Sequence, residues 1–351
     1  MQIGLIGVKY TGKTTLFNSI TGAGLPTGQG GVDPHRAVGR VPDPRLDRLT
    51  AMFHPKRTVH AQVEWVDVPG FEGGAGADGA RESTRFLEHA RRVDALAVVV
   101  RCFPSAFGAP EPADELQTLL LELILADLQI VENRLDKMTK DKQRLGKVAN
   151  PLEPPMMERF KEQLESERPL RDLELNPDEK KIAAGYAFLT QKPLIVVLNH
   201  GEGDEAPADA VAAATAAGAE VVALCASIEA ELAELAPDEA AEFLADLGIA
   251  EPAVNRMIRA AYHALNYHSF FTVGPDECRA WAVRRGATAP EAAGVIHSDL
   301  QRGFIRAETT AYDDLIAAGT LAAAKAANKV RLEGKAYVVQ DGDILEIRFS
   351  V

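Results

Sequence analysis

Hydrophobic residues along this chain gather in short runs separated by longer segments of mixed polarity. The runs at residues 3–6, 63–66, 95–100, 193–198 and 220–224 are rich in β-branched residues. Continuous apolar runs of this length are typical of strands buried on both faces of a parallel sheet, and helical patterns between several of them supply the covering layers. The pattern therefore predicts an α/β domain with a doubly wound, mostly parallel sheet.

A different pattern interrupts this domain between the third and fourth runs. Apolar residues recur there at alternating spacings of three and four, the seam of a helix that pairs with another helix. They are Leu121, Ile124, Leu128, Val131, Leu135 and Met138. A break marked by Gly and Pro, residues 146–155, leads into a second helical pattern with Phe160 and Leu164. We predict an inserted α-helical hairpin over 113–177, between the two parts of the α/β domain, 1–112 and 178–266.

The pattern changes again after residue 266. Strand patterns at 270–273, 280–284 and 305–310 accompany a helix whose expected N-cap is Thr288. Two further strand patterns, at 336–340 and 344–349, flank Asp341-Gly342-Asp343, which predicts a β-hairpin. Residues 267–351 are therefore expected to form an α+β domain of their own.

Composition changes this picture little. Hydrophobic residues make up 46% of the chain and charged residues 25%, as in ordinary globular proteins. No stretch approaches the roughly 20 continuous apolar residues of a membrane span, so we expect a cytoplasmic protein without membrane contact. The three cysteines are far apart, which favours neither a disulfide framework nor a zinc knuckle. A net charge of −13 argues against indiscriminate nucleic-acid binding, and no specific DNA partner is expected.

Local basic surfaces remain compatible with this net charge. One set lies at the expected tip of the hairpin: Arg134, Lys137, Lys140, Lys142, Arg144 and Lys147. Another lies in the C-terminal domain: Arg279, Arg284, Arg285, Arg302 and Arg306. Either set could contact RNA phosphates, which would make binding weaken as salt rises. For the hairpin set alone, a solvated helix face is the competing interpretation.

The strongest chemical signal is Gly7-Val8-Lys9-Tyr10-Thr11-Gly12-Lys13-Thr14, which has the spacing of a phosphate-binding loop between a strand and a helix. The two glycines let the backbone curl so that N–H groups point at phosphate oxygens. Lys13 places a cation at the terminal phosphates and stabilises their charge, while the Thr14 hydroxyl can bind Mg²⁺. The expected nucleotide-binding residues here are Lys9, Tyr10, Thr11, Gly12, Lys13, Thr14 and Thr15.

The tetrapeptide Asp67-Val68-Pro69-Gly70 supplies the second half of this signal. The Asp67 carboxylate can hold Mg²⁺ through water, so Thr14 and Asp67 are the predicted metal residues, and the Gly70 N–H can sense a terminal phosphate. The glycine-rich segment 73–77 is expected to be a mobile switch, with a plain flexible loop as the alternative. Phe71 stands where many small GTPases place a water-orienting Gln, so hydrolysis should be slow or need help.

The fourth apolar run ends in Asn199-His200-Gly201-Glu202, where a nucleotide-binding protein would recognise the base. A guanine-specific site usually has Asn-Lys-x-Asp, whose Asp accepts two hydrogen bonds from guanine. This chain lacks both that Lys and that Asp. A longer or displaced Glu need not oppose the ring lone pair of adenine, so we predict weakened guanine selectivity.

Together these residues resemble the YchF-type, Obg-like family of P-loop ATPases. The most specific segments of the resemblance are 41–47 (VPDPRLD), 100–103 (VRCF), 122–128 (ELILADL), 279–308 and 330–349. The resemblance implies a P-loop G domain, an inserted helical hairpin and a C-terminal TGS domain of β-grasp type. It also implies Mg²⁺ and ATP as ligands, with GTP as the alternative, and the ribosome as partner. The residues that it places beside the base are Asn199, His200, Glu202, Ala226 and Ser227.

Several positions depart from the family pattern. Tyr10 replaces the usual Asn, which makes potassium stimulation doubtful, and Gly31 stands where the switch Thr is expected unless Thr27 substitutes. Residues 104–110 contain no catalytic His, and Ser227 replaces the usual Lys beside the base. These departures support nucleotide binding better than turnover. Three functions stay open: a slow ATPase switch, an Obg-type GTPase, and a nucleotide-binding interaction protein that has lost hydrolysis.

Overall fold

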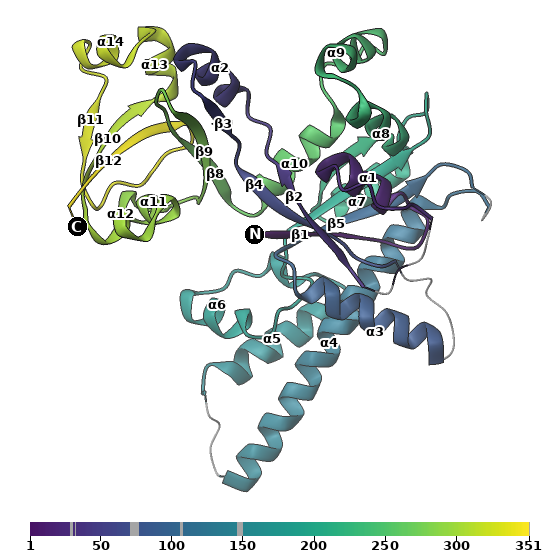
Figure 1. Ribbon diagram of the computed structural model, residues 1–351. Helices are drawn as coiled ribbons and strands as arrows, with labels where there is room; N and C mark the ends of the chain where they lie inside the picture. The colour runs from purple at the N-terminus through teal and green to yellow at the C-terminus, as the bar shows by residue number, and fades with distance from the viewer. Residues whose placement is uncertain (29–30, 32, 71–76, 106–107, 146–149, 351) are drawn as a thin grey trace. The chain divides into compact units, whose positions relative to one another are not determined.

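A computed structural model describes residues 1–28, 31, 33–70, 77–105, 108–145 and 150–350 (Figure 1). By its internal contacts the chain divides into two compact units. The first unit is Met1–Ala37 with Glu64–Met257, and the second is Val38–Val63 with Ile258–Val351. The sequence pattern placed residues 38–63 with the nucleotide-binding domain, whereas their contacts group them with the second unit.

The first unit is built on a six-stranded sheet of order β2-β4-β1-β5-β6-β7. Its strands are β1 (Gln2–Ile6), β2 (His35–Arg40), β4 (Gln62–Asp67), β5 (Ala95–Cys102), β6 (Leu194–His200) and β7 (Glu220–Leu224). β1 pairs in parallel with β4 and β5, and the parallel pairing continues through β6 to β7. β5 and β6 are buried along almost their whole length, which explains their continuous apolar runs. The predicted doubly wound α/β fold is confirmed.

Helices from distant parts of the chain cover this sheet. They are α1 (Lys13–Thr21), α3 (Ala77–Arg91), α7 (Ala208–Ala216) and α8 (Ala226–Glu234). α9 (Pro237–Asp246) packs on α8, and α10 (Ala253–Ala264) runs from the first unit into the second. One core cluster joins Phe86 of α3 and Ala214 of α7 to Val98 and Val196 of the central strands. The sheet therefore holds the carboxyl ends of β1, β4, β5 and β6 in fixed positions.

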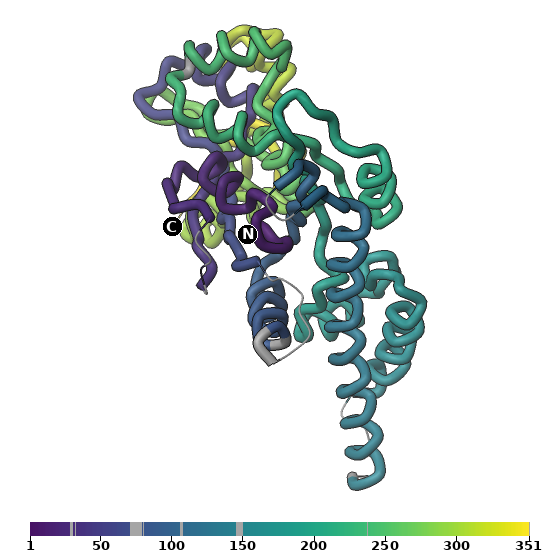
Figure 2. Tube along the Cα trace, turned by 90° about the vertical axis from the view of Figure 1, so that its right-hand side faces the viewer, coloured from purple at the N-terminus to yellow at the C-terminus, as the bar shows by residue number. Residues whose placement is uncertain are grey.

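The inserted hairpin consists of α4 (Pro112–Leu145) and α5 (Glu153–Glu165), followed by a short 3₁₀ turn (Leu170–Asp172) and α6 (Pro177–Ala184). The first turns of α4 pack on the sheet, and the outer turns pack on α5 through Val131, Met138 and Phe160. Figure 2 shows α4 continuing well beyond the sheet. Leu121, which the spacing placed on the seam, is instead 39% exposed. No helix among the described ranges is long and apolar enough to cross a membrane.

A buried carboxylate fixes the hairpin to the sheet. Asp127 in the middle of α4 is fully buried and accepts hydrogen bonds from the backbone N–H groups of Leu189 and Thr190, at 3.1 and 2.8 Å, and from the Thr190 hydroxyl at 2.8 Å. Arg91 of α3 donates to the same carboxylate at 2.8 Å. A buried charge is stable only when it is paired and hydrogen-bonded in this way, so Asp127 fixes the position of α4.

The second unit contains a mixed sheet of order β11-β10-β12-β8-β9-β3. Its strands are β3 (Arg57–Val59), β8 (Tyr267–Thr272), β9 (Glu277–Arg284), β10 (Phe304–Ala311), β11 (Arg331–Glu333) and β12 (Asp343–Phe349). Its helices are α2 (Pro44–Phe53), α11 (Ala289–Ile296), α12 (Ser298–Arg302), α13 (Tyr312–Ala318) and α14 (Leu321–Ala326). α11 begins after Thr288, as predicted, with Glu291 accepting from the Thr288 N–H at 2.7 Å.

The predicted hairpin around Asp341-Gly342-Asp343 is wrong. β12 pairs antiparallel with β10 and in parallel with β8, while residues 336–340 contribute only an isolated bridge from Val338 to Thr288. The Asp343 carboxylate accepts from the Tyr337 hydroxyl and the Gln340 N–H, at 2.6 and 2.9 Å, so a side chain fixes this turn in place of a strand ladder. With partners on both sides at its start, β12 has no place for residues 336–340.

Candidate functional site

The loop between β1 and α1 has the conformation that its glycines allow. Gly7 and Gly12 have φ values of 145° and 92°, which side chains rarely adopt. A Cβ on Gly7 would lie 2.5 Å from the Val99 carbonyl oxygen, and one on Gly12 would clash with the Asn199 amide. The backbone can therefore curl at the end of β1 only because these two positions carry no side chain.

The curled loop forms one wall of a cavity of about 320 Å³. The predicted residues that line it are Lys9, Tyr10, Gly12, Lys13, Thr14, Thr15, Asp67 and Gly70. They come from two segments, the loop before α1 with the first turn of that helix, and the end of β4 with the residues that follow it. The parallel pairing of β1 with β4 brings these segments together. The structure thus gathers most of the phosphate-side prediction into a single pocket.

Lys13 is buried in this pocket, with 6% of its surface exposed. Its ammonium donates to the Val8 carbonyl oxygen at 2.5 Å. Burial lowers the pKa of Lys13 to about 8, against the opposing attraction of Asp67 and Glu115. A single carbonyl satisfies an ammonium poorly, so the oxygens of a polyphosphate would be better partners for this charge.

Thr14 and Asp67 meet directly, because the Thr14 hydroxyl donates to the Asp67 carboxylate at 2.7 Å. Burial raises the pKa of Asp67, although this hydrogen bond and the charges of Lys13 and His35 act in the opposite direction. Adjacent hydroxyl and carboxylate oxygens are the ligands that Mg²⁺ prefers. No cluster of three His, Cys, Asp or Glu side chains suited to a metal exists among the residues described, so a Mg²⁺ ion here would need phosphate and water as further ligands.

Tyr10 lies at the mouth of the pocket with a φ of 66° and 48% of its surface exposed. Asn adopts such left-handed conformations more readily than an aromatic residue does. A strained backbone of this kind costs roughly 1–3 kcal/mol and is usually retained where it serves a binding site. The departure from Asn therefore lies in the wall of the pocket itself.

The predicted base-side residues are arranged differently. Asn199 is 3% exposed, and its amide donates to the Thr11 carbonyl at 2.9 Å and accepts from the Ala226 N–H at 2.9 Å. It therefore braces the phosphate loop against the start of α8. His200 contacts its neighbour Gly201, Ser227 lies 3.1 Å from the Cys225 sulfur, and Glu202 is exposed. None of the last three lines the cavity, so their contact with a base stays a prediction.

The departures from the family pattern can be located in part. Gly31 and Thr27 both line the cavity, which puts a hydroxyl in the wall near the position of the expected switch Thr. Arg101 donates to Ser105 and to the Phe103 and Gly108 carbonyls, and this holds the loop that lacks a His. Phe71 and most of the glycine-rich switch segment lie outside the described residues.

Several residues near the pocket were missed by sequence reasoning, including Pro26 and Gly28 of its wall. Asp33, His35 and Phe103 line the cavity, and Glu115 of α4 is close enough to Lys13 to affect its pKa. Burial raises the pKa of Glu115 itself. The spacing of the motifs offers no signal for Asp33, His35 or Glu115, whereas Phe103 ends a segment already singled out by its resemblance to the family.

A glycine-dependent loop from strand to helix, a buried lysine and a hydroxyl–carboxylate pair at the ends of parallel strands define a P-loop nucleotide-binding protein. Comparison with known proteins gives the family. Two family models match the chain: YchF-GTPase_C, described as "Protein of unknown function (DUF933)", over 267–350, and "50S ribosome-binding GTPase" over 2–134. The chain belongs to the YchF family.

Relatives from distant organisms support this assignment. The chain is 42% identical to "Ribosome-binding ATPase YchF" of Bacillus subtilis, with full coverage of both proteins. It is 35% identical to "Obg-like ATPase 1" of Oryza sativa subsp. japonica, covering all of this chain and 92% of the relative. The solved structure of the Schizosaccharomyces pombe YchF GTPase superposes with a TM-score of 0.86 at 30% identity, covering 99% of this chain and 97% of that one.

Proposed function

We propose that this protein binds ATP with Mg²⁺, hydrolyses it slowly, and acts on the ribosome in the cytoplasm as a nucleotide-dependent switch. The observation that carries the proposal is the pocket in which Lys13, Thr14 and Asp67 lie together. The loop N–H groups and Lys13 would hold the phosphates. Thr14 and Asp67 would hold Mg²⁺, which would neutralise phosphate charge.

ATP is favoured over GTP because Asn199 is followed by Glu202 in place of the Lys and Asp of guanine sites. The Bacillus relative carries the word ATPase in its name, whereas the yeast structure and both family models carry the word GTPase. GTP is therefore the second candidate ligand. Titration calorimetry with Mg·ATP and Mg·GTP tests the choice, and tighter GTP binding would overturn the ATP assignment.

Slow turnover follows from the side chains available to the attacking water. Phe71 offers no hydrogen bond, and residues 104–110 contain no His. Among the described lining residues, His35 is the one imidazole, a group that exchanges protons near neutral pH. Single-turnover measurements with and without ribosomes would separate slow hydrolysis from its loss, because a lost activity stays absent at any ribosome concentration.

Ribosome binding would use the exposed basic residues of the hairpin, Lys137, Lys140, Lys142 and Arg144. Arg134 is less suited to this role because it already donates to Glu153 at 2.9 and 2.7 Å. We expect co-sedimentation with ribosomes to weaken when Lys137, Lys140 and Arg144 are neutralised together, and to fall with rising salt. Unchanged co-sedimentation at low salt would exclude the hairpin as the contact.

A further inference from the structure

The segment Val38–Val63, which we call the excursion, lies in the sequence between two parts of the chain that reach the nucleotide pocket. β2 begins at His35, and β4 ends at Asp67, and both of these residues line the pocket. The excursion itself belongs to the second unit. The second unit is therefore joined covalently to both flanks of the pocket, and a third time through α10.

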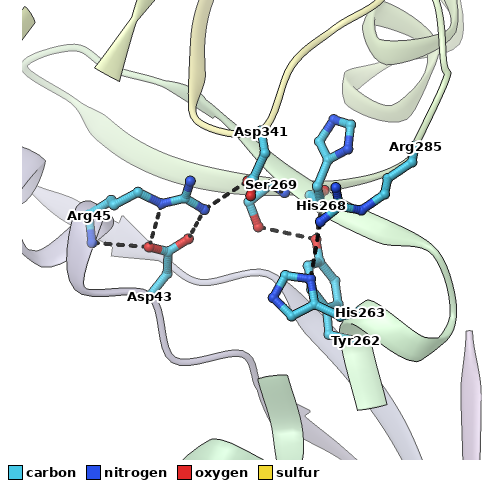
Figure 3. A network of polar contacts seen from close by, with 8 residues as sticks. All are labelled: Asp43, Arg45, Tyr262, His263, His268, Ser269, Arg285 and Asp341. Carbon is cyan, nitrogen blue, oxygen red and sulfur yellow. Dashed lines mark hydrogen bonds and ion pairs between the residues drawn. The ribbon is translucent and has the colours of Figure 1, made fainter. Parts of the chain in front are cut away.

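Arg45, at the start of α2, ties the excursion into the second unit (Figure 3). Asp43 caps α2 and accepts from the Arg45 N–H, Nε and Nη2, at 3.0, 3.0 and 2.9 Å. The same Nη2 donates to Asp341 at 2.9 Å, and the guanidinium lies 5.2 Å from the centre of the Phe271 ring. One planar side chain thus joins a helix cap, the turn before β12 and the face of β8.

The turn at Asp341 is shaped for this contact. Gly342 has a φ of 89°, and a Cβ there would lie 3.1 Å from Arg45 Nη1. Asp341 also accepts from the Ser269 N–H at 3.4 Å. A glycine at position 342 therefore permits the close approach of the guanidinium.

The network continues to α10, the third connection between the units. The Tyr262 hydroxyl donates to the His268 carbonyl at 2.9 Å and lies 3.1 Å from the Ser269 hydroxyl (Figure 3). Ser269 in turn contacts Asp341, the partner of Arg45. A single polar network in the second unit thus reaches both the excursion and α10. These are the segments through which the chain passes between the two units.

The far end of the excursion is fastened separately. β3 pairs in parallel with β9 over Arg57–Val59, and Lys56 forms an ion pair with Asp276 at 2.8 Å. The Val41 N–H donates to the Ala61 carbonyl at 2.8 Å, which closes the excursion into a loop. The second unit therefore holds the excursion at two places, and a movement of β2 or β4 must strain these contacts or carry them along.

We infer that Arg45 is a positioning residue for the nucleotide site, and that through the excursion the occupancy of the pocket and the order of the second unit are energetically coupled. The inference rests on the proposed binding of ATP. Coupling of this kind is reciprocal: if ATP stabilises one arrangement of β2 and β4, the Arg45 contacts must in turn affect ATP affinity. A purely structural Arg45 would stabilise the second unit and leave ATP affinity unchanged.

The test uses the full-length protein and four variants: Arg45→Ala, Arg45→Lys, Asp341→Asn and Lys329→Ala. Lys329 is the control, because it forms a half-exposed ion pair with Asp314 at 2.9 Å in the second unit, outside the network. Calorimetry measures Mg·ATP affinity. Hydrogen exchange with and without ATP measures the order of residues 267–272 and 341–345.

We expect ATP to slow exchange in these two segments of the wild type and of the Lys329→Ala control. Arg45→Ala should bind ATP about fivefold more weakly or worse, the lower end of typical coupling between sites, and should lose the effect of ATP on exchange. Arg45→Lys should be intermediate, because Lys cannot make the forked contact with Asp43. Asp341→Asn preserves the shape of the turn but weakens its contact with Arg45, so it tests the same contact if Arg45→Ala fails to fold.

Two results would overturn the inference while the proposed function stands. One is ATP binding that leaves exchange in the second unit of the wild type unchanged. The other is wild-type ATP affinity in both Arg45→Ala and Asp341→Asn. Absence of ATP binding by the wild type would instead overturn the proposed function, and with it the coupling.

Discussion

The phosphate side and the base side of the nucleotide site are held in different ways. Lys13 and Asp67 both line the cavity, where the Lys13 ammonium donates to the Val8 carbonyl oxygen and the Asp67 carboxylate accepts from the Thr14 hydroxyl. Asn199 is instead bonded to the protein on two sides, and Glu202 is exposed. The residues predicted to bind phosphate therefore line an open pocket, whereas Asn199, which was predicted to contact the base, is bonded to the protein on two sides.

Lys13→Ala should have the largest effect on this contrast. Removing the buried cation forfeits charged hydrogen bonds to the phosphates worth about 3 kcal/mol, so ATP should bind about 100-fold more weakly. Lys9→Ala is the comparison variant, because Lys9 also lines the pocket from the same loop, but its ammonium already pairs with Glu82 at 3.2 Å. Calorimetry gives both affinities. Equal losses in the two variants would show that general positive charge, and no special position of Lys13, holds the phosphates.

Asn199→Ala should show that this residue braces the loop. Leaving Thr11 and Ala226 without their partner costs about 1–3 kcal/mol for each group, which should lower the melting temperature and weaken ATP and GTP binding alike, by about tenfold or more. Asn176→Ala is the control, because Asn176 also makes two hydrogen bonds to backbone, at the start of α6. A loss confined to ATP would mean that Asn199 mainly reads the base.

The pH dependence of ATP binding sharpens the picture of the phosphate side. Burial lowers the pKa of Lys13 to about 8, and bound phosphates would raise it again, so ATP binding takes up a proton. Affinity should therefore be complete below pH 8 and fall as pH rises through it, by about tenfold at pH 9. Calorimetry from pH 7 to 9 measures this. If Lys13→Ala shows the same fall of ATP affinity with pH as the wild type, the titrating group is not Lys13.

Glu202→Ala should have the smallest effect, confined to base selectivity. Because Glu202 is exposed, its removal should leave the melting temperature unchanged and reduce the preference for ATP over GTP by about threefold, the value of a modest exposed hydrogen bond. Glu205→Ala, also exposed and three residues further on, is the control. An unchanged ratio of ATP to GTP affinity would remove Glu202 from the base site.

The parts of the site that the sequence predicts are those fixed by short segments. The spacing from Gly7 to Thr14 determines a loop between one strand and the next helix, and Asp67 follows directly from the end of a recognisable strand. Local spacing has few structural solutions, so the residues that line the pocket around Lys13 could be named in advance. The inserted hairpin was predictable for the same reason. The spacing also placed Leu121 on the buried seam of α4, and there the prediction failed, because Leu121 is exposed.

The parts that escaped prediction depend on pairing between distant segments. β3 finds its partner β9 more than 200 residues along the chain, and Asp341 meets Arg45 across a similar separation. Nothing in the pattern of residues 38–63 states which sheet they will join, because a short polar strand fits either one. His35 escaped notice likewise, since only the path of β2 brings it to the pocket.

The inner and outer parts of α4 pack against different partners, and this affects how the length of the inserted hairpin can vary. The first turns of α4, with Leu116, Leu119 and Leu123, belong to the core of the sheet, and Asp127 marks the end of that attachment. Beyond Asp127, α4 packs on α5 and on residues 170–188 rather than on the sheet. Insertions or deletions of whole turns there would change the reach of the hairpin by about 5.4 Å per turn and spare the nucleotide pocket. The length of the hairpin can therefore change without altering the residues that line the nucleotide pocket.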